Sequence, residues 1–440
     1  MNIEDYFIQF REKTIGENIT NEDNIKLIYA DWAGSGRFYR DIEEEILNYF
    51  APLYGNMHSQ NTYIGNFIES SYNNAKGVIK NHFGANDDYA VISIGSGMTA
   101  AILKLQDIIL NNIKYERNEI KPVVFITVYE HNSNYISWIN KGMDIVIIDN
   151  NEFGQPDVND FEFKLNENKD RKLKIASFSA CSNITGIKID LKPLVYKAKE
   201  FDLLVCIDCT AIVPYENIKI SDFEEKIDAL VFSGHKLLGG VGGTGILIIK
   251  KSIYKCDIPT NVGGGVVEWV NPWGGNVYFN DLEAREETGT PAIIQTIKTS
   301  LAIKLKEKMG VEYIHKRESE IIDIFFDKLK GIENIHIYDE LYKNRIGIVS
   351  FNIKNINYNN VVHKLSTLYG IQSRGGCCCA SIYAHKLLNI DSKESSEITD
   401  KQIYKLDKPG FVRISTNPIM TNEDIITICN AITKISQDYI

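Results

Sequence analysis

The chain has 440 residues, 44% of them hydrophobic and 24% charged, which is enough for a large core and two domains. A formal charge of −10 and an isoelectric point near 5.5 argue against a broad nucleic-acid-binding face or a surface for anionic membranes. The N-terminus lacks a basic segment followed by an apolar stretch, and apolar runs such as 123–128 are too short to cross a bilayer. We therefore expect a cytoplasmic protein that acts on small ligands, with no nucleic-acid or membrane partner.

Short apolar runs alternate with longer amphipathic segments between residues 88 and 250. This alternation is typical of a mainly parallel sheet covered by helices, and hence of the α/β class. The predicted strands are 89–94, 123–128, 144–148, 175–179, 203–207, 229–232 and 245–249, and the predicted helices include 98–111, 134–141 and 191–201. In such sheets ligands bind beyond the carboxyl ends of the strands, so the residues that follow each strand are the candidates for a site.

Three of the strand ends each supply polar or glycine residues that are candidates for the site. Gly97 and Thr99 belong to a glycine turn that opens a helix, where free N–H groups can bind a phosphate. The alternative is a plain turn in which Thr99 caps the helix. His131 follows the second strand and can lie over a flat ring or bond within its loop, and Asn183 follows the fourth strand and can meet a ring hydroxyl or cap a turn.

Two charged side chains at strand ends carry more weight. Asp208 closes an apolar run, and a buried carboxylate is costly unless an arginine, a helix N-terminus or a protonated ring nitrogen meets it. Lys236 follows another apolar run within Ser233-Gly234-His235-Lys236. Desolvation there would lower the pKa of the amine and let it act as a Schiff-base lysine; the alternative is a solvated loop charge.

The eight cysteines are too sparse and uneven for a disulfide framework. Cys206 and Cys209 lie in a predicted strand and its exit, with no second ligand pair at zinc-site spacing, so we expect core cysteines and no metal. Cys377, Cys378 and Cys379 follow Arg374 in a loop-like context, which favours a reactive thiol.

The pattern changes after residue 250. A glycine-rich stretch leads to a long helix at 292–310, followed by alternating helices and strands that end in a helix at 422–436. We predict a large α/β domain at 41–300 and a smaller α+β domain made of 1–40 and 301–440.

Taken in order, these residues resemble the class V aminotransferase group of fold-type I pyridoxal-phosphate enzymes, within it the cysteine desulfurase and selenocysteine lyase branch. The resemblance runs from Tyr29-Ala30-Asp31-Trp32-Ala33-Gly34 to Lys408-Pro409-Gly410-Phe411-Val412-Arg413, hence over nearly the whole chain.

The resemblance implies a pyridoxal 5′-phosphate cofactor and a role for each candidate. Lys236 would bind the cofactor covalently, Asp208 would pair with its pyridine nitrogen, His131 would stack on the ring and Asn183 would reach the ring hydroxyl. The phosphate would be held by Gly97, Thr99, Ser233, His235 and, from the neighbouring subunit of a homodimer, Thr290. Arg374 would bind the substrate carboxylate, and Cys379 falls where the desulfurases carry their nucleophile.

The implied reaction converts L-cysteine to L-alanine and leaves the sulfur on Cys379 as a persulfide, from which a sulfur-acceptor protein could take it. The chain departs from the family pattern at Ala211, where a glutamine is common, and at Met98, where a threonine is usual. Ala211 and the Gly376-Cys377-Cys378-Cys379 run are closer to the molybdenum-cofactor sulfurases. Cys377 and Cys378 are either a persulfide relay or neighbours in a small-residue loop. Transamination, carbon-sulfur lysis, epimerisation and a non-catalytic binding role on the same fold remain alternatives.

Overall fold

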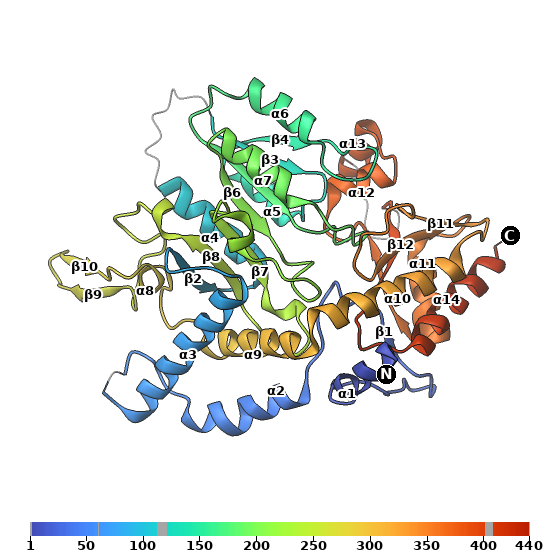
Figure 1. Cartoon of the computed structure of the whole chain (residues 1–440), viewed down its shortest axis with the longest axis horizontal. Helices are drawn as coiled ribbons and strands as arrows, with labels where there is room; N and C mark the ends of the chain where they lie inside the picture. Colours follow the sequence, from blue (N-terminus) through green and yellow to red (C-terminus); the bar gives the residue numbers. More distant parts are fainter. Residues whose placement is uncertain (1, 60, 112–120, 401–407, 440) are drawn as a thin grey trace.

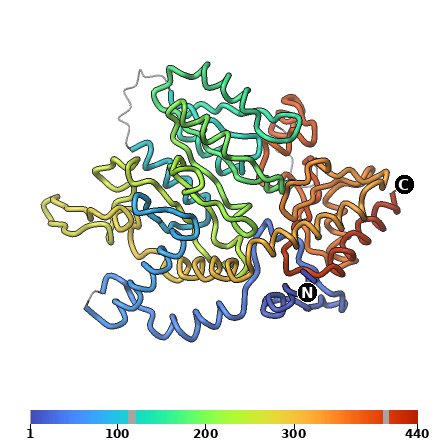
Figure 2. The backbone as a smooth tube through the Cα atoms, in the orientation of Figure 1, coloured from blue at the N-terminus to red at the C-terminus, as the bar shows by residue number. Residues whose placement is uncertain are grey.

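The computed structural model describes residues 2–59, 61–111, 121–400 and 408–439. A seven-stranded sheet with its helices forms the larger part of the molecule, and a four-stranded sheet with its own helices lies beside it (Figure 1). Both ends of the chain lie on the side of the smaller sheet (Figure 2). Along the described residues, no helix combines the length and the apolar character that a membrane-crossing segment requires.

The seven-stranded sheet is mainly parallel, as predicted. Its strands, in spatial order, are β2 (Tyr89–Ile94), β8 (Gly245–Lys250), β7 (Ala229–Ser233), β6 (Leu204–Asp208), β5 (Lys174–Ser179), β3 (Val123–Thr127) and β4 (Asp144–Ile148). Only β8 runs antiparallel to its neighbours β2 and β7. All seven predicted strands are found, each within one residue of its expected ends.

Successive residues of the central strands point to opposite faces of this sheet, so each strand is buried on both sides. Val123 and Phe125 join one core cluster, and Val124 and Ile126 join the other. The second face is covered by α4 (Gly97–Asn111) and α5 (Ser133–Asn140); the first is covered by α3 (Tyr63–His82), α6 (Val158–Glu167), α7 (Leu191–Glu200) and α9 (Ile293–Met309). The sequence analysis did not predict α3 or α6.

The smaller sheet is antiparallel, in the order β11 (Ile335–Ile337), β12 (Ile348–Ile353), β15 (Phe411–Ser415) and β14 (Arg374–Gly376). Its helices are α10 (Val311–Leu329), α11 (Tyr358–Tyr369), α12 (Ser381–Leu387), α13 (Ser392–Asp400) and α14 (Asn422–Gln437). The N-terminal segment returns to this part of the molecule: α1 (Ile3–Arg11) packs on α10, and β1 (Ile28–Tyr29) pairs with β13 (Ile371–Gln372).

The remaining elements of the larger part are short. They are α2 (Arg40–Glu45), a π-helical turn (Ile46–Phe50), 3-10 turns (Ala51–Leu53, Ile220–Phe223, Gly234–Lys236 and Lys251–Ile253), α8 (Leu282–Glu286) and the hairpin of β9 (Val267–Val270) and β10 (Asn276–Tyr278). The hairpin projects from the body in Figure 1.

The chain passes between the two parts at Gly310, where α9 ends and α10 begins. α9 packs on α3, and α10 packs on α14. The predicted domain boundary at 300/301 stays a prediction. Within the two predicted domains, residues 1, 60, 112–120, 401–407 and 440 lie outside the described residues.

Candidate functional site

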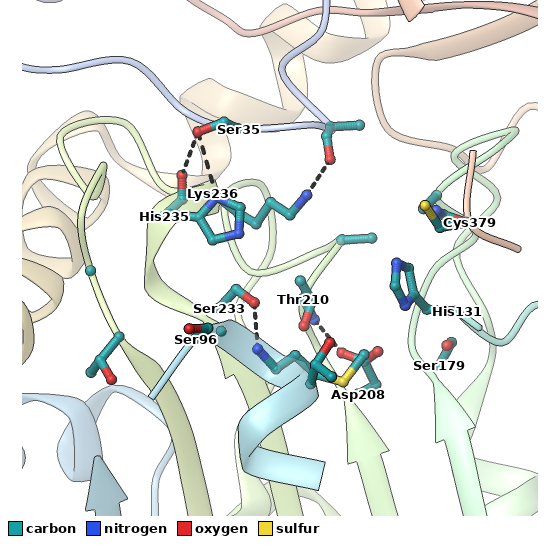
Figure 3. Close-up of a pocket in the computed structure, with 18 of the residues that line it drawn as sticks. Ser35, Ser96, His131, Ser179, Asp208, Thr210, Ser233, His235, Lys236 and Cys379 are labelled. Atoms are coloured by element: carbon teal, nitrogen blue, oxygen red, sulfur yellow. Dashed lines mark hydrogen bonds between the residues drawn. The ribbon is translucent and has the colours of Figure 1, made fainter. Parts of the chain in front are cut away.

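A cavity of about 770 Å³ lies at the carboxyl ends of the large sheet, where the two parts of the molecule meet. Figure 3 shows Lys236 and His235 on one side, His131 and Cys379 on the other, and Asp208 and Ser233 at the strand ends below. Ten of the eleven predicted site residues line this cavity: Gly97, Thr99, His131, Asn183, Asp208, Ser233, His235, Lys236, Arg374 and Cys379. The exception is Thr290, which is exposed and lies outside its lining.

Lys236 ends the 3-10 turn that follows β7. Its Nζ donates to the carbonyl oxygens of Ala33 and Gly34, at 2.6 and 2.7 Å, so the N-terminal segment covers the amine. Burial, with the Arg413 guanidinium as the next cause, lowers the pKa of Lys236 to about 8. About one tenth of the amine is therefore neutral at pH 7, which supplies the unprotonated form that a Schiff-base lysine requires.

Asp208 is the last residue of β6 and is only 6% exposed. Its Oδ1 accepts a hydrogen bond from the Thr210 N–H at 2.9 Å, and among the described residues no lysine or arginine forms an ion pair with it. Burial raises the pKa of this carboxyl. The sequence left three possible partners for Asp208: an arginine, a helix N-terminus or a protonated ring nitrogen. Among the described residues, neither of the first two meets its carboxylate. A cationic group of a ligand would therefore meet an acid that has no ion-pair partner.

The glycine turn after β2 is shaped by close packing against Ser233. The Met98 N–H donates to Ser233 Oγ at 2.7 Å, and a Cβ on Gly97, whose φ is +66°, would stand 2.8 Å from that oxygen. Thr99 does not cap α4, because the helix already begins at Gly97; its Oγ1 meets Ser133 Oγ at 2.7 Å. The turn therefore brings hydroxyl and N–H groups together at the start of a helix, where an anion is favoured.

His131 forms the opposite wall in front of α5. Burial, together with the charges of Lys236 and Arg374, lowers the pKa of His131 to about 4, so the imidazole is neutral near pH 7. The Ser133 N–H donates to its Nδ1 at 3.2 Å, which orients the ring. Glu130, which is fully buried beside it, accepts from Ser179 and joins this loop to β5. Burial raises the pKa of Glu130 to about 7.

Arg374 and Cys379 come from the small sheet and the loop that follows β14. The Nη2 atom of Arg374 lies 3.3 Å from Cys379 Sγ, and Cys379 is the one exposed thiol of the three in the loop. Cys378 is buried in the same cavity, whereas Cys377 is half-buried outside it. Burial raises the pKa of the Cys377 and Cys378 thiols. The contact with a guanidinium singles out Cys379 as the thiol best placed to react as a thiolate.

The loop is held in an unusual conformation. The Ala380 N–H donates to the Cys377 carbonyl at 3.2 Å, and both residues between them, Cys378 and Cys379, have left-handed φ angles of 49° and 61°. Each such residue costs about 1–3 kcal/mol and persists only where its surroundings impose it. Asn183 supplies one restraint, because its Nδ2 donates to the Cys378 carbonyl at 2.7 Å. Its Oδ1 is buried without a partner.

Arg413 and Asp31 also line or approach the cavity and were given no role from the sequence. Arg413 is 1% exposed; its Nη2 bonds to Asp31 Oδ1 at 2.5 Å and its Nη1 donates to the Asn183 carbonyl at 2.9 Å. The sequence does contain a signal for Arg413: it is a charged residue inside the apolar run 411–414. Asp208 was predicted from the same kind of signal. Ser35 and Cys181 also line the cavity, and the sequence analysis did not single them out.

Known proteins with similar sequences were compared with the chain. The profile of the family described as Aminotransferase class-V matches residues 28–428. The chain belongs to this family. A probable cysteine desulfurase of Staphylococcus aureus (strain Mu50 / ATCC 700699) is 25% identical over 371 residues, 83% of this chain and 86% of that protein. A probable cysteine desulfurase of Staphylococcus epidermidis (strain ATCC 12228 / FDA PCI 1200) is 25% identical over 362 residues, 81% and 84% of the two chains.

Solved structures show that this class V chain shares its fold with cysteine desulfurases. The apo cysteine desulfurase of Thermococcus onnurineus NA1 superposes with a TM-score of 0.78 at 22% identity, over 94% of this chain and 95% of that one. The cysteine desulfurase CsdA of Escherichia coli, in its S-sulfonic acid form, gives 0.73 at 20% identity, over 99% of each chain. The predicted family and fold class are thereby confirmed.

Proposed function

We propose that the protein is a pyridoxal-phosphate-dependent enzyme that converts L-cysteine to L-alanine and receives the sulfur on Cys379 as a persulfide. The observation that carries this proposal is the Arg374–Cys379 contact at 3.3 Å, which brings a carboxylate-binding group and a reactive thiol to the wall opposite Lys236. The names of the relatives from both Staphylococcus species support it.

The groups around the cavity fit pyridoxal phosphate. Lys236 offers a partly neutral amine, Asp208 an unpaired buried carboxylate, and Asn183 an unpartnered buried Oδ1. The turn at Gly97 and the hydroxyl of Ser233, with His235 beside them, offer donors for a phosphate. We infer that His131 lies against the face of the ring.

Two arginines are available for the substrate carboxylate. Arg374 is half-buried and forms no ion pair with another described residue, whereas Arg413 is buried and already paired with Asp31. Arg374 is therefore the better candidate for a bidentate contact with the substrate carboxylate, and Arg413 would add its positive charge to the site.

The chemistry follows from the placement of the proton acceptor and the thiol. Bound pyridoxal phosphate withdraws electrons from the α-carbon of an attached amino acid. Lys236 would take the α-proton on its neutral Nζ, while Asp208 would hold the proton on the pyridine nitrogen. The Cys379 thiolate would attack the substrate sulfur; the carbon-sulfur bond breaks and a sulfur-sulfur bond forms. The balance is L-cysteine plus the Cys379 thiol giving L-alanine plus the Cys379 persulfide.

The test is to incubate the pyridoxal-phosphate-loaded protein with L-cysteine and identify both products by mass spectrometry. We expect alanine and a persulfide on Cys379 in the wild type, and neither in Cys379→Ala, which should keep its cofactor. Cys377→Ala is the matched control and should stay active, because Cys377 does not line the cavity. Desulfuration at the wild-type rate in Cys379→Ala would contradict the assigned nucleophile.

The same experiment separates the alternatives. Pyruvate and ammonia would indicate a carbon-sulfur lyase, a keto acid with retained sulfur an aminotransferase, and a racemised amino acid, seen by chiral separation, an epimerase. A protein that takes up no pyridoxal phosphate would indicate a binding role. Ala211 lines the cavity where the family commonly has a glutamine. This departure from the family pattern is the main reason to test the alternative reactions.

We further propose a homodimer in which Thr290 reaches the phosphate of the neighbouring site, because Thr290 is exposed and outside its own cavity. The exposed Cys379 suits transfer of the persulfide sulfur to an acceptor protein. The cytoplasmic location stays a prediction.

A further inference from the structure

Asn132 stands beside His131 at the start of α5, but its side chain does not serve that helix. Asparagine is a favoured N-cap residue, yet the Asn132 side chain makes no capping bond to α5. Its Oδ1 instead accepts the Ser381 N–H at 2.9 Å, across 249 residues of sequence. Ser381 begins α12, whose own N-cap residue, Ala380, has no side-chain acceptor. Asn132 therefore supplies the cap that α12 lacks.

A second bond from Asn132 reaches the reactive loop itself. Its backbone N–H donates to the Cys379 carbonyl at 2.7 Å. Asn132 thus contacts the chain at Cys379 and again at Ser381, so its two bonds bracket Ala380 and hold the backbone directly after the thiol-bearing residue. Because Cys379 has a left-handed φ of 61°, its backbone depends on such outside restraints.

We propose that Asn132 is a positioning residue that sets where the Cys379 thiol stands relative to the ring-binding wall of the cavity. Because His131 and Asn132 are consecutive, the wall that would hold the ring and the loop that carries the nucleophile share one anchor. The inference rests on the proposed desulfurase reaction for its effect on turnover, but the placement of the thiol can be measured without that reaction.

Three variants distinguish the position of the Cys379 loop from the effect of a charge at residue 132. Asn132→Ala removes the acceptor for the Ser381 N–H; since misplacement of a reacting group by about 1 Å costs up to about a hundredfold, we expect kcat to fall by about ten- to a hundredfold with KM and bound cofactor unchanged. Asn132→Asp keeps an acceptor oxygen and should recover most of kcat. Asn140→Ala, at the exposed far end of the same helix, is the matched control and should behave as wild type.

The second readout is alkylation of Cys379 by iodoacetamide without substrate, resolved by peptide mass spectrometry against pH. Wild type and Asn140→Ala should give the same profile. Asn132→Ala should alkylate more slowly near pH 7, because the loop is released from the Arg374 contact, and Asn132→Asp, which keeps an acceptor oxygen for the Ser381 N–H, should alkylate at close to the wild-type rate.

The outcomes distinguish this inference from the proposed function. If the wild type makes no persulfide but the alkylation profiles differ as stated, the positioning role stands and the reaction does not. If the wild type makes persulfide but Asn132→Ala keeps wild-type kcat and alkylation, the positioning role is overturned. Equal losses in Asn132→Ala and Asn132→Asp with a lowered melting temperature would also overturn it, since that pattern indicates a merely structural residue.

Discussion

The two walls of the cavity are built in different ways. The wall with Lys236 and Asp208 consists of strand ends in a sheet buried on both faces: Asp208 ends β6, and Lys236 ends the 3-10 turn directly after β7. The wall with Arg374 and Cys379 consists of a three-residue strand and a loop with left-handed residues. That loop is held by bonds from Asn132 and Asn183, which belong to the other part of the molecule.

This difference matches a division of labour. The strand-end wall carries the groups that would bind and tune the cofactor, where rigidity is useful because the same geometry serves every turnover. The loop wall carries Arg374 and Cys379, which under the proposed function would bind the substrate carboxylate and accept sulfur, and so would have to meet a substrate and then a sulfur acceptor. If the division is real, substitutions on one wall should leave the properties of the other intact.

Lys236→Ala should give the largest effect. Without its amine the cavity should still bind pyridoxal phosphate reversibly, but borohydride should fix no cofactor to the protein, and turnover should fall by about 10⁴-fold, the upper range for a lost general base. Peptide mapping of the reduced wild type should find the label on Lys236 and not on Lys306. Lys306 is the informative comparison, because burial also lowers its pKa, to about 7, but it lies outside the cavity.

Label on Lys306 would mean that a lowered amine pKa is enough for covalent capture of pyridoxal phosphate. The cavity would then not determine which lysine reacts. Loss of Cys379 alkylation in Lys236→Ala would mean that the two walls are not independent.

Arg374→Lys should give the next largest effect, on the other wall. A lysine keeps the charge but loses the planar pair of donors, so KM for L-cysteine should rise by about ten- to a hundredfold, the equivalent of one charge-assisted hydrogen bond. The measurement is a set of KM and kcat values beside a pyridoxal-phosphate titration, with Arg171→Lys at the surface as control. Weaker cofactor binding in Arg374→Lys would contradict the separation of roles.

The sequence was sufficient for the strand-end wall and insufficient for the loop wall, for a physical reason. Asp208 and Lys236 could be predicted because an apolar run of strand length places the next polar residue at the sheet edge, a purely local rule. The pairing of Arg413 with Asp31 spans 382 residues and depends on how the N-terminal segment docks beside β15. No local pattern contains that docking.

The same limit applies to Cys379 and Thr290. The position of Cys379 after Arg374 was identified through family resemblance, but the left-handed turn and its anchor at Asn132 arise from tertiary contacts. Two non-glycine residues in succession with positive φ contradict local preference, and only the assembled fold can impose them. Thr290 lies outside the cavity of its own chain, so the role proposed for it would require a second copy.

The pH dependence of cofactor capture should give the smallest effect and test the strand-end wall alone. Burial and then Arg413 lower the pKa of Lys236 from 10.5 to about 8. The folded value lies below the unfolded one, so protonation of the amine is penalised in the folded chain. The penalty is complete below about pH 8, and stability from this group rises between pH 8 and 10.5. The neutral fraction of such an amine rises from about one tenth at pH 7 to about nine tenths at pH 9, so borohydride-trapped adduct should form about tenfold faster at pH 9. Lys236→Ala should show no such rise.

A midpoint near 10.5 in the wild type would mean that Lys236 is solvated, and the strand-end wall would then lack the desolvation that distinguishes it from the loop.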